Sequence, residues 1–205
     1  MLLQTPVYNL KQFPNVYTPS EDSFLLLDTL EADMNNIIQI NPDFIVEIGS
    51  GSGVIITALA AFLKNTRCFA TDINPEACIA TTTTSILNNT CVEACNMTFL
   101  TCFKENVFDI IVFNPPYVVT DSEEVFGNGV ARAWAGGIDG CEVINQFLKS
   151  LPNLMSSKGI CYLLLIKENN PQKIINILYG MKFNVNIVKQ RKIPCEHLYV
   201  LKIYK

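Results

Sequence analysis

Asn114, Pro115, Pro116 and Tyr117 follow directly after the apolar run at residues 107–113. An apolar run of this length is typical of a parallel strand that is buried on both faces. The two prolines end the strand, because each lacks an N–H group and fixes its own φ near about −65°. Asn114 therefore lies at the carboxyl edge of a sheet, where open α/β folds bind ligands. Its side-chain amide offers one hydrogen-bond acceptor and two donors to a ligand, although an isolated Asn-Pro pair is more often only a turn.

A second chemical pattern combines a glycine-rich turn with an acidic residue. The apolar run 44–48 leads into Gly49-Ser50-Gly51-Ser52-Gly53, and residues 54–64 then show helical periodicity. Because glycines tolerate positive φ and let backbone approach a ligand, strand, turn and helix in this order indicate nucleotide binding. The spacing is G-x-G-x-G, which differs from the G-x-G-x-x-G of dinucleotide enzymes. Asp72 ends the next predicted strand, 67–72, where it could bind ribose hydroxyls or merely cap the following helix.

Further elements must position these groups. We predict a helix from Glu21 with Ser20 as its N-cap, a helix at 75–87, a short third strand at 97–100, a helix at 141–154, a fifth strand at 159–166, a helix after Pro171, and closing strands at 183–188 and 198–204. Asp22 suits the positive N-terminus of its helix. The threonine run 81–84 is interpreted as the solvated part of the helix at 75–87.

No repeat or linker divides the chain. We therefore expect an irregular lead-in, residues 1–15, followed by a single domain, residues 16–205. The loop from Val118 to Ile138 carries several glycines, Gly129 among them, and the only tryptophan, Trp134. A long loop beside a site often covers a substrate, and a role of Trp134 there and a role as a core anchor carry equal weight.

Composition and charge narrow the possible function classes. A net charge of −4 and a pI of about 5.0 give no basic field for phosphate backbones, which weakens a nucleic-acid interpretation without excluding it. No apolar run reaches the roughly 18 residues of a membrane span, and no secretion signal is visible, so we expect a cytoplasmic protein. The eight cysteines are irregularly spaced and His197 is the only histidine, so we expect no metal site.

In combination, these motifs carry a family resemblance. The chain resembles the class I S-adenosylmethionine-dependent methyltransferases, and among them the HemK-type glutamine methyltransferases of translation release factors, in particular the short eukaryotic form. The matching stretches are VYTPSEDSFLLLDTLE at 16–31, VEIGSGSGVI at 46–55, TDINPEA at 71–77, FDIIVFNPPYVVT at 108–120, AWAGGIDG at 133–140 and IKENNP at 166–171. The resemblance implies a Rossmann-like α/β fold with a seven-stranded, mostly parallel sheet, an antiparallel last strand and helices on both faces.

The resemblance also implies the cofactor S-adenosyl-L-methionine, its product S-adenosyl-L-homocysteine, and a role for each residue around it. The implied contacts are Tyr17 and Ser23 at the methionine end, Glu47, Gly49 and Gly51 at the amino-acid part, Asp72 at the ribose diol, Ile73 at the adenine, and Asn114 beside the methyl group. Family members usually place an acid after the third strand to bind the adenine amine. Cys102 and Phe103 correspond to that position here, so the adenine would be bound more weakly or through backbone groups.

The catalytic residues that the resemblance implies are Asn114, Pro115, Pro116 and Tyr117. An amide nitrogen is a poor nucleophile, because its lone pair is delocalised into the carbonyl group. If the Asn114 side-chain oxygen and the Pro115 carbonyl each accept one N–H, the lone pair faces the sulfonium methyl group and developing positive charge is stabilised. Tyr117 would pack against the planar amide, and no strong general base is required.

The resemblance implies two protein partners. One is the class I release factor, whose Gly-Gly-Gln motif would be the substrate, and the other is a small zinc-binding activator subunit in a heterodimer. A hydrophobic content of 49% suits a partner that covers an apolar edge. Membranes are not expected as partners, and nucleic acid is disfavoured.

Two alternatives remain open. DNA or RNA adenine amino-methyltransferases also use an Asn-Pro-Pro-Tyr motif, but the acidic pI, the three arginines and the lack of a target-recognition domain argue against that class. The second alternative is a non-catalytic scaffold that binds the cofactor, as the missing acid near Cys102 would allow.

Overall fold

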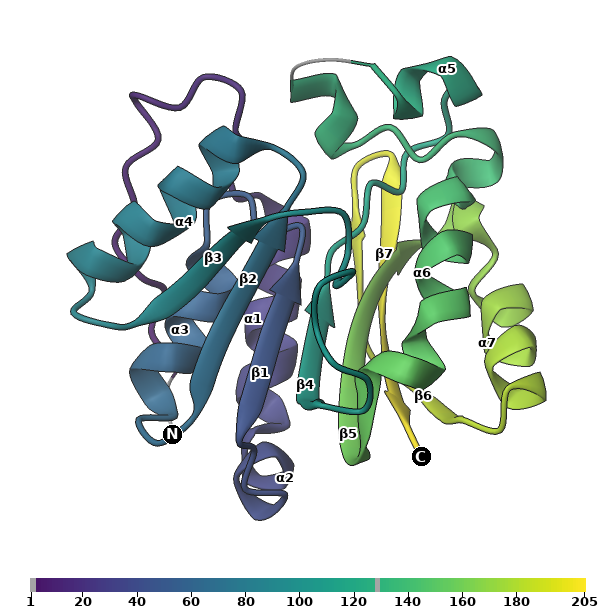
Figure 1. The fold of residues 1–205 in the computed structure, drawn as a ribbon. Coiled ribbons are helices and arrows are strands. Elements are labelled where there is room, and N and C mark those ends of the chain that lie inside the picture. The colour runs from purple at the N-terminus through teal and green to yellow at the C-terminus, as the bar shows by residue number, and fades with distance from the viewer. Residues whose placement is uncertain (1–2, 128–129) are drawn as a thin grey trace.

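A seven-stranded sheet forms the centre of the computed structural model, which describes residues 3–127 and 130–205 (Figure 1). The strands are β1 (Phe44–Ile48), β2 (Arg67–Asp72), β3 (Val92–Asn96), β4 (Phe108–Phe113), β5 (Met155–Ile166), β6 (Asn184–Ile193) and β7 (Glu196–Tyr204). Their order across the sheet is β3-β2-β1-β4-β5-β7-β6. Strands β1 to β5 pair in parallel, whereas β7 pairs antiparallel with both β5 and β6. The predicted sheet, with an antiparallel last strand, is confirmed.

Helices cover both faces of this sheet (Figure 1). On one face lie α1 (Glu21–Ala32), α3 (Val54–Phe62) and α4 (Pro75–Leu87), and on the other lie α6 (Glu142–Leu154) and α7 (Pro171–Gly180). The short elements are α2 (Met34–Gln39), α5 (Ser122–Val125) and the 3-10 turns η1 (Val130–Ala133), η2 (Ile138–Gly140) and η3 (Lys167–Asn169). None of the helices in the described parts of the chain has the length and apolar character needed to cross a membrane.

The central strand β4 positions the Asn-Pro-Pro-Tyr segment. Every residue of β4 is buried, because neighbouring strands flank it and helices cover both of its faces. Its one charged residue, Asp109, accepts hydrogen bonds from the Asp43 N–H at 2.7 Å and the Ser156 hydroxyl at 2.6 Å. Pro115 and Pro116 then stop the strand at the carboxyl edge of the sheet, as predicted from the sequence.

The prediction of a third strand at 97–100 is wrong. The strand is β3, residues Val92–Asn96, and it forms one edge of the sheet. An edge strand needs apolar residues mainly where a helix covers it, so Val92 is buried while Glu93 is exposed, and the segment carries only a weak apolar signal. The more apolar segment after it cannot continue the strand, since Phe99 has a φ of 48°.

The threonine run of α4 also differs from its prediction. Thr81 and Thr84 are buried, with 0% and 1% of their surface exposed, and are not part of a solvated face. Residues 3–15 form no helix or strand, and they are bonded to α4. The N–H and carbonyl of Val7 both bond to the side chain of Asn88, at 2.9 and 2.7 Å. Helix α4 is therefore fixed from both sides, by the sheet and by the lead-in.

Candidate active site

A cavity of about 620 Å³ lies at the carboxyl ends of β1, β2 and β4. The order of strands along the chain reverses between β1 and β4, and open α/β sheets bind ligands at such a switch point. The volume falls within the range of about 300–1,000 Å³ that is usual for small-molecule sites. The start of α1, the turns after β1 and β4, the end of β2 and parts of segment 125–135 form its walls.

The glycine-rich turn forms as predicted. Gly49, Gly51 and Gly53 have φ values of 66°, 51° and 75°, a region that residues with a side chain rarely adopt. The N–H groups of Gly49 and Ser50 donate to the Thr71 carbonyl at 2.7 and 3.1 Å, which ties the turn to the end of β2. Among the described residues, none has an atom within 4 Å of a Cβ built at Gly51, so the turn has open space at this point.

Replacing Gly51 or Gly53 of this turn by alanine should lower the free energy of unfolding by different amounts. Gly51→Ala is expected to lower the free energy of unfolding by about 1 kcal/mol, from backbone strain alone. Gly53→Ala is expected to lower it by about 3 kcal/mol, because the new Cβ would lie 2.6 Å from the Thr81 Cα in addition to the strain. Urea unfolding of both variants and the wild type measures the two values. Equal losses would contradict the close packing of Gly53 against α4.

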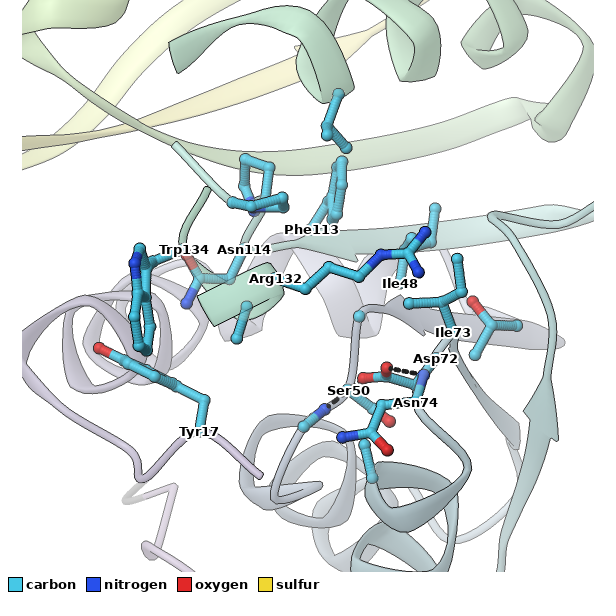
Figure 2. A pocket seen from close by; sticks show the side chains of 18 of the residues that line it. Tyr17, Ile48, Ser50, Asp72, Ile73, Asn74, Phe113, Asn114, Arg132 and Trp134 are labelled. Carbon is cyan, nitrogen blue, oxygen red and sulfur yellow. Dashed lines mark hydrogen bonds between the residues drawn. The ribbon is translucent and has the colours of Figure 1, made fainter. Parts of the chain in front are cut away.

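Two carboxyl groups flank the turn, that of buried Glu47 and that of half-buried Asp72. Asp72 accepts the N–H groups of Gly51 at 2.9 Å and Asn74 at 2.8 Å, and burial raises the pKa of its carboxyl group (Figure 2). Glu47 accepts the Ile56 N–H at 2.9 Å, and burial raises its pKa well above the usual range. Burial disfavours the ionised form of both acids, so a ligand that brings positive charge and hydrogen-bond donors would suit them.

Asp22 determines how Asn114 faces the cavity. Its buried carboxyl group accepts hydrogen bonds from Asn114 Nδ2 at 2.9 Å, the Tyr117 hydroxyl at 3.3 Å and the Tyr17 hydroxyl at 3.4 Å. A carboxylate only accepts, so it selects the nitrogen of the Asn114 amide and leaves the oxygen for another partner. That oxygen, Oδ1, is buried and has no partner among the described residues. The site thus contains one oriented, unsatisfied acceptor.

This role of Asp22 was not predicted from the sequence, because a helix N-terminus already explained an acid at that position. A signal was present, because Asp22 lies between Tyr17 and Ser23, the two residues of this stretch that the resemblance places at the cofactor.

The segment around η1 closes the cavity from the other side. Figure 2 shows Trp134 and Tyr17 at the end of the cavity where Asn114 lies, and Arg132 extended toward Ile73. Trp134 lines the cavity with 38% of its surface exposed, which favours a role in the site over a core anchor. The charge of Arg132 opposes the rise in the Asp72 pKa that burial causes. Gly129, one of the loop glycines, lies outside the described residues.

All of the predicted site residues line the cavity except Cys102 and Phe103. Their assignment to the adenine is corrected, because it depended on the misplaced third strand. The Phe103 ring packs against Phe69 and Phe108, with ring centroids 5.3 and 5.1 Å apart, and Cys102 is exposed. The residues that reach the cavity after β3 are Met97, Thr98 and Phe99.

Two further findings concern metal ligands and bases. In residues 3–127 and 130–205, no three His, Cys, Asp or Glu side chains gather as a metal site. The only histidine, His197, lies on β7 and bonds Gln190 at 3.1 Å and Tyr199 at 2.9 Å. It is not among the residues that line the cavity.

Comparison with known proteins adds to this fold and this site. The family model "Methyltransferase small domain" matches residues 10–133, so the chain is a methyltransferase of this class. Human "Methyltransferase HEMK2" is 40% identical over 198 residues, which cover 94% of this chain and 91% of that protein. The "eRF1 methyltransferase catalytic subunit mtq2" of Schizosaccharomyces pombe is 36% identical over 223 residues, covering 100% and 96%. The chain belongs to the HEMK2 and Mtq2 family of methyltransferases.

A solved structure of the same family has the same fold. The E. cuniculi Mtq2–Trm112 complex, described as responsible for methylation of the eRF1 translation termination factor, matches with a TM-score of 0.71 and 26% identity. The match covers 93% of this chain and 99% of the solved one.

Proposed function

We propose that this chain transfers a methyl group from S-adenosyl-L-methionine to the side-chain amide nitrogen of a glutamine. The substrate would be the glutamine of the Gly-Gly-Gln motif in the class I translation termination factor. The observation that carries this proposal is the unsatisfied Asn114 Oδ1, oriented by Asp22 at the wall of the cavity. Similarity over the whole chain to a protein named for eRF1 methylation supports the choice of substrate.

The residues of the cavity fit the cofactor. Glu47 and the glycine-rich turn would hold its amino-acid part, and Asp72 would accept hydrogen bonds from the ribose diol. Ile73, of which 41% is exposed, offers an apolar surface to the adenine ring. The bound cofactor supplies an electrophilic methyl group on a positively charged sulfur, which suits a cavity lined by the buried carboxyl groups of Asp22 and Glu47.

The Asn-Pro-Pro-Tyr segment would orient the glutamine. Asn114 Oδ1 accepts one N–H of the substrate amide and the Pro115 carbonyl accepts the other, which turns the nitrogen lone pair toward the methyl group. Both acceptors stabilise the positive charge that develops on nitrogen, and they are in place before the reaction. Buried Tyr117 forms one wall, and burial raises its pKa, so its hydroxyl stays protonated and donates to Asp22.

A labelling experiment tests the proposed reaction. Cofactor labelled in its methyl group is offered with the termination factor, with the same factor carrying alanine in place of the target glutamine, and with DNA and RNA. We expect label only in the unchanged factor. Label in nucleic acid would favour the adenine amino-methyltransferase. Bound cofactor without label in any substrate would favour the non-catalytic scaffold.

Asp72→Ala tests the cofactor site. We expect the dissociation constant of S-adenosyl-L-homocysteine to rise about 10- to 100-fold, because a charged hydrogen-bond acceptor for the ribose is lost. Turnover at saturating cofactor should change much less, since Asp72 does not touch the substrate nitrogen. Calorimetry measures the affinity, and an unchanged dissociation constant would rule out the ribose role.

We further propose that a small activator subunit binds this chain, as Trm112 accompanies Mtq2 in the solved complex, and that it covers the β3 edge. Beside this edge, α4 exposes Ile79, Ile86 and Leu87, and edge strands with apolar neighbours favour association. Ile86→Asp should abolish co-purification with the subunit. The matched change at the opposite edge, Ile187→Asp on β6, should leave it intact. The reverse result would move the interface to β6.

A further inference from the structure

The four consecutive threonines of α4 divide into two pairs by the bonds of their hydroxyl groups. Thr82 and Thr83 donate to carbonyls one turn earlier in the same helix, those of Cys78 at 3.0 Å and Ile79 at 2.8 Å. Thr81 and Thr84 are buried, and their hydroxyls bond outside the helix. Residues three apart share one helix face, and for this pair it is the face toward the glycine-rich turn.

The bonds of this inner pair end on consecutive residues of the turn. Thr81 Oγ1 lies 2.8 Å from Ser50 Oγ and 3.3 Å from the Gly51 carbonyl oxygen. The Thr84 hydroxyl donates to the Ser52 carbonyl oxygen at 2.7 Å. Two successive carbonyl groups of the turn therefore depend on α4 for their hydrogen bonds.

Direct packing accompanies these bonds. A Cβ at Gly53 would meet the Thr81 Cα at 2.6 Å, so the backbone of the turn lies directly against α4. The Gly51 peptide is held at both ends, since its N–H donates to Asp72 at 2.9 Å while its carbonyl oxygen faces Thr81. Thr81 thus acts on the orientation of both the turn and the Asp72 carboxyl group.

We propose that Thr81 and Thr84 are positioning residues of the cofactor site, a role that rests on the proposed function. Three glycines at positive φ give the turn many accessible conformations, and a turn that must be ordered on binding weakens the affinity. The two hydroxyls hold the turn in one conformation before the cofactor arrives. Their effect is therefore on cofactor affinity and not on the methyl-transfer step.

The threonine run supplies its own control. Thr81→Val and Thr84→Val keep the shape of the side chain and remove the hydroxyl, and each should raise the dissociation constant of S-adenosyl-L-homocysteine about three- to tenfold. Thr83→Val removes a bond within the helix only, and it should leave the constant within about twofold. Thr81→Ser, which keeps the hydroxyl group, should bind S-adenosyl-L-homocysteine with the wild-type affinity. KM for the cofactor should follow the dissociation constant, while kcat at saturating cofactor stays near the wild-type value.

The outcomes separate this role from a structural one. Thermal unfolding identifies a temperature at which every variant is fully folded, and affinities are compared there. Equal affinity in Thr81→Val, Thr84→Val and wild type overturns the positioning role, as does an equal loss in Thr83→Val. If one of the two valine variants fails to fold, the dissociation constant of the other is sufficient to test the positioning role. A wild type that binds no S-adenosyl-L-homocysteine overturns the proposed function and this role together.

Discussion

Asn114→Ala is expected to lower turnover about 10²- to 10³-fold, the effect of removing one preorganised polar group from a reaction centre. The reason is the unsatisfied Oδ1, which has no partner in the described protein and would be met only by a substrate N–H. Without it, the substrate amide can rotate, and the charge that develops on its nitrogen loses a fixed acceptor. The loss should appear in kcat with saturating cofactor and termination factor.

Cofactor affinity provides the control for this variant. Gly51, Asp72 and Glu47 remain unchanged in it, so the dissociation constant of S-adenosyl-L-homocysteine should stay within about threefold. Asn145→Ala, which removes an exposed asparagine from α6, should leave both kcat and the dissociation constant of S-adenosyl-L-homocysteine unchanged. Near-wild-type methylation by Asn114→Ala with bound cofactor would remove Asn114 from the reaction.

Local signals made the central part of the site predictable. All six residues of β4 are buried, and all are apolar except the hydrogen-bonded Asp109. This run and the two prolines after it define the strand and its end without any knowledge of the fold. The glycine-rich turn is equally local, since only glycine adopts its backbone conformation readily. The motifs therefore predicted the edge of the sheet at which both Asn114 and Asp72 lie.

The features that could not be predicted from the sequence depend on tertiary contacts. A threonine in a helix can bond to its own helix or to another element, and only the packing of α4 against the turn separates Thr81 from Thr83. The edge strand β3 is weakly apolar because it needs cover on one face only, so its position was misjudged by several residues. Asp22 and Asn114 are 92 positions apart, and no local pattern joins them.

The hydroxyl groups of Tyr17 and Tyr117 donate hydrogen bonds to the Asp22 carboxyl group. Burial raises the pKa of Tyr17 to about 12, with the charge of Asp22 as the second cause, and burial raises the pKa of Tyr117 further. Both hydroxyls therefore stay protonated at neutral pH and donate to Asp22, as Asn114 and the Ser23 N–H do. Asp22 therefore acts only as an acceptor in these four hydrogen bonds. The Asn114 amide must turn its nitrogen toward Asp22, which leaves its oxygen without a partner.

Asp22→Asn is expected to lower turnover about 10- to 100-fold, the range for hydrogen bonds to charged groups. An amide at position 22 can face Asn114 with either its oxygen or its nitrogen, so it no longer selects one orientation of the Asn114 side chain. It also removes the negative charge that polarises the Asn114 amide and strengthens Oδ1 as an acceptor. Glu21→Gln is the matched control, because Glu21 lies next to Asp22 but pairs with Arg191 at 2.8 Å on the surface.

A double-mutant cycle distinguishes positioning from independent action by Asp22. If Asp22 acts through Asn114, the change Asp22→Asn should cost less than about threefold in turnover when Asn114 is already alanine. The dissociation constant of S-adenosyl-L-homocysteine, measured in all four proteins, corrects for any effect on the neighbouring Ser23, whose N–H lies 2.6 Å from Asp22. Fully additive losses would show that Asp22 contributes without Asn114, for example by direct contact with the substrate. The geometry predicts the non-additive result, since the carboxyl group bonds Asn114 Nδ2 and only Oδ1 is left for the glutamine.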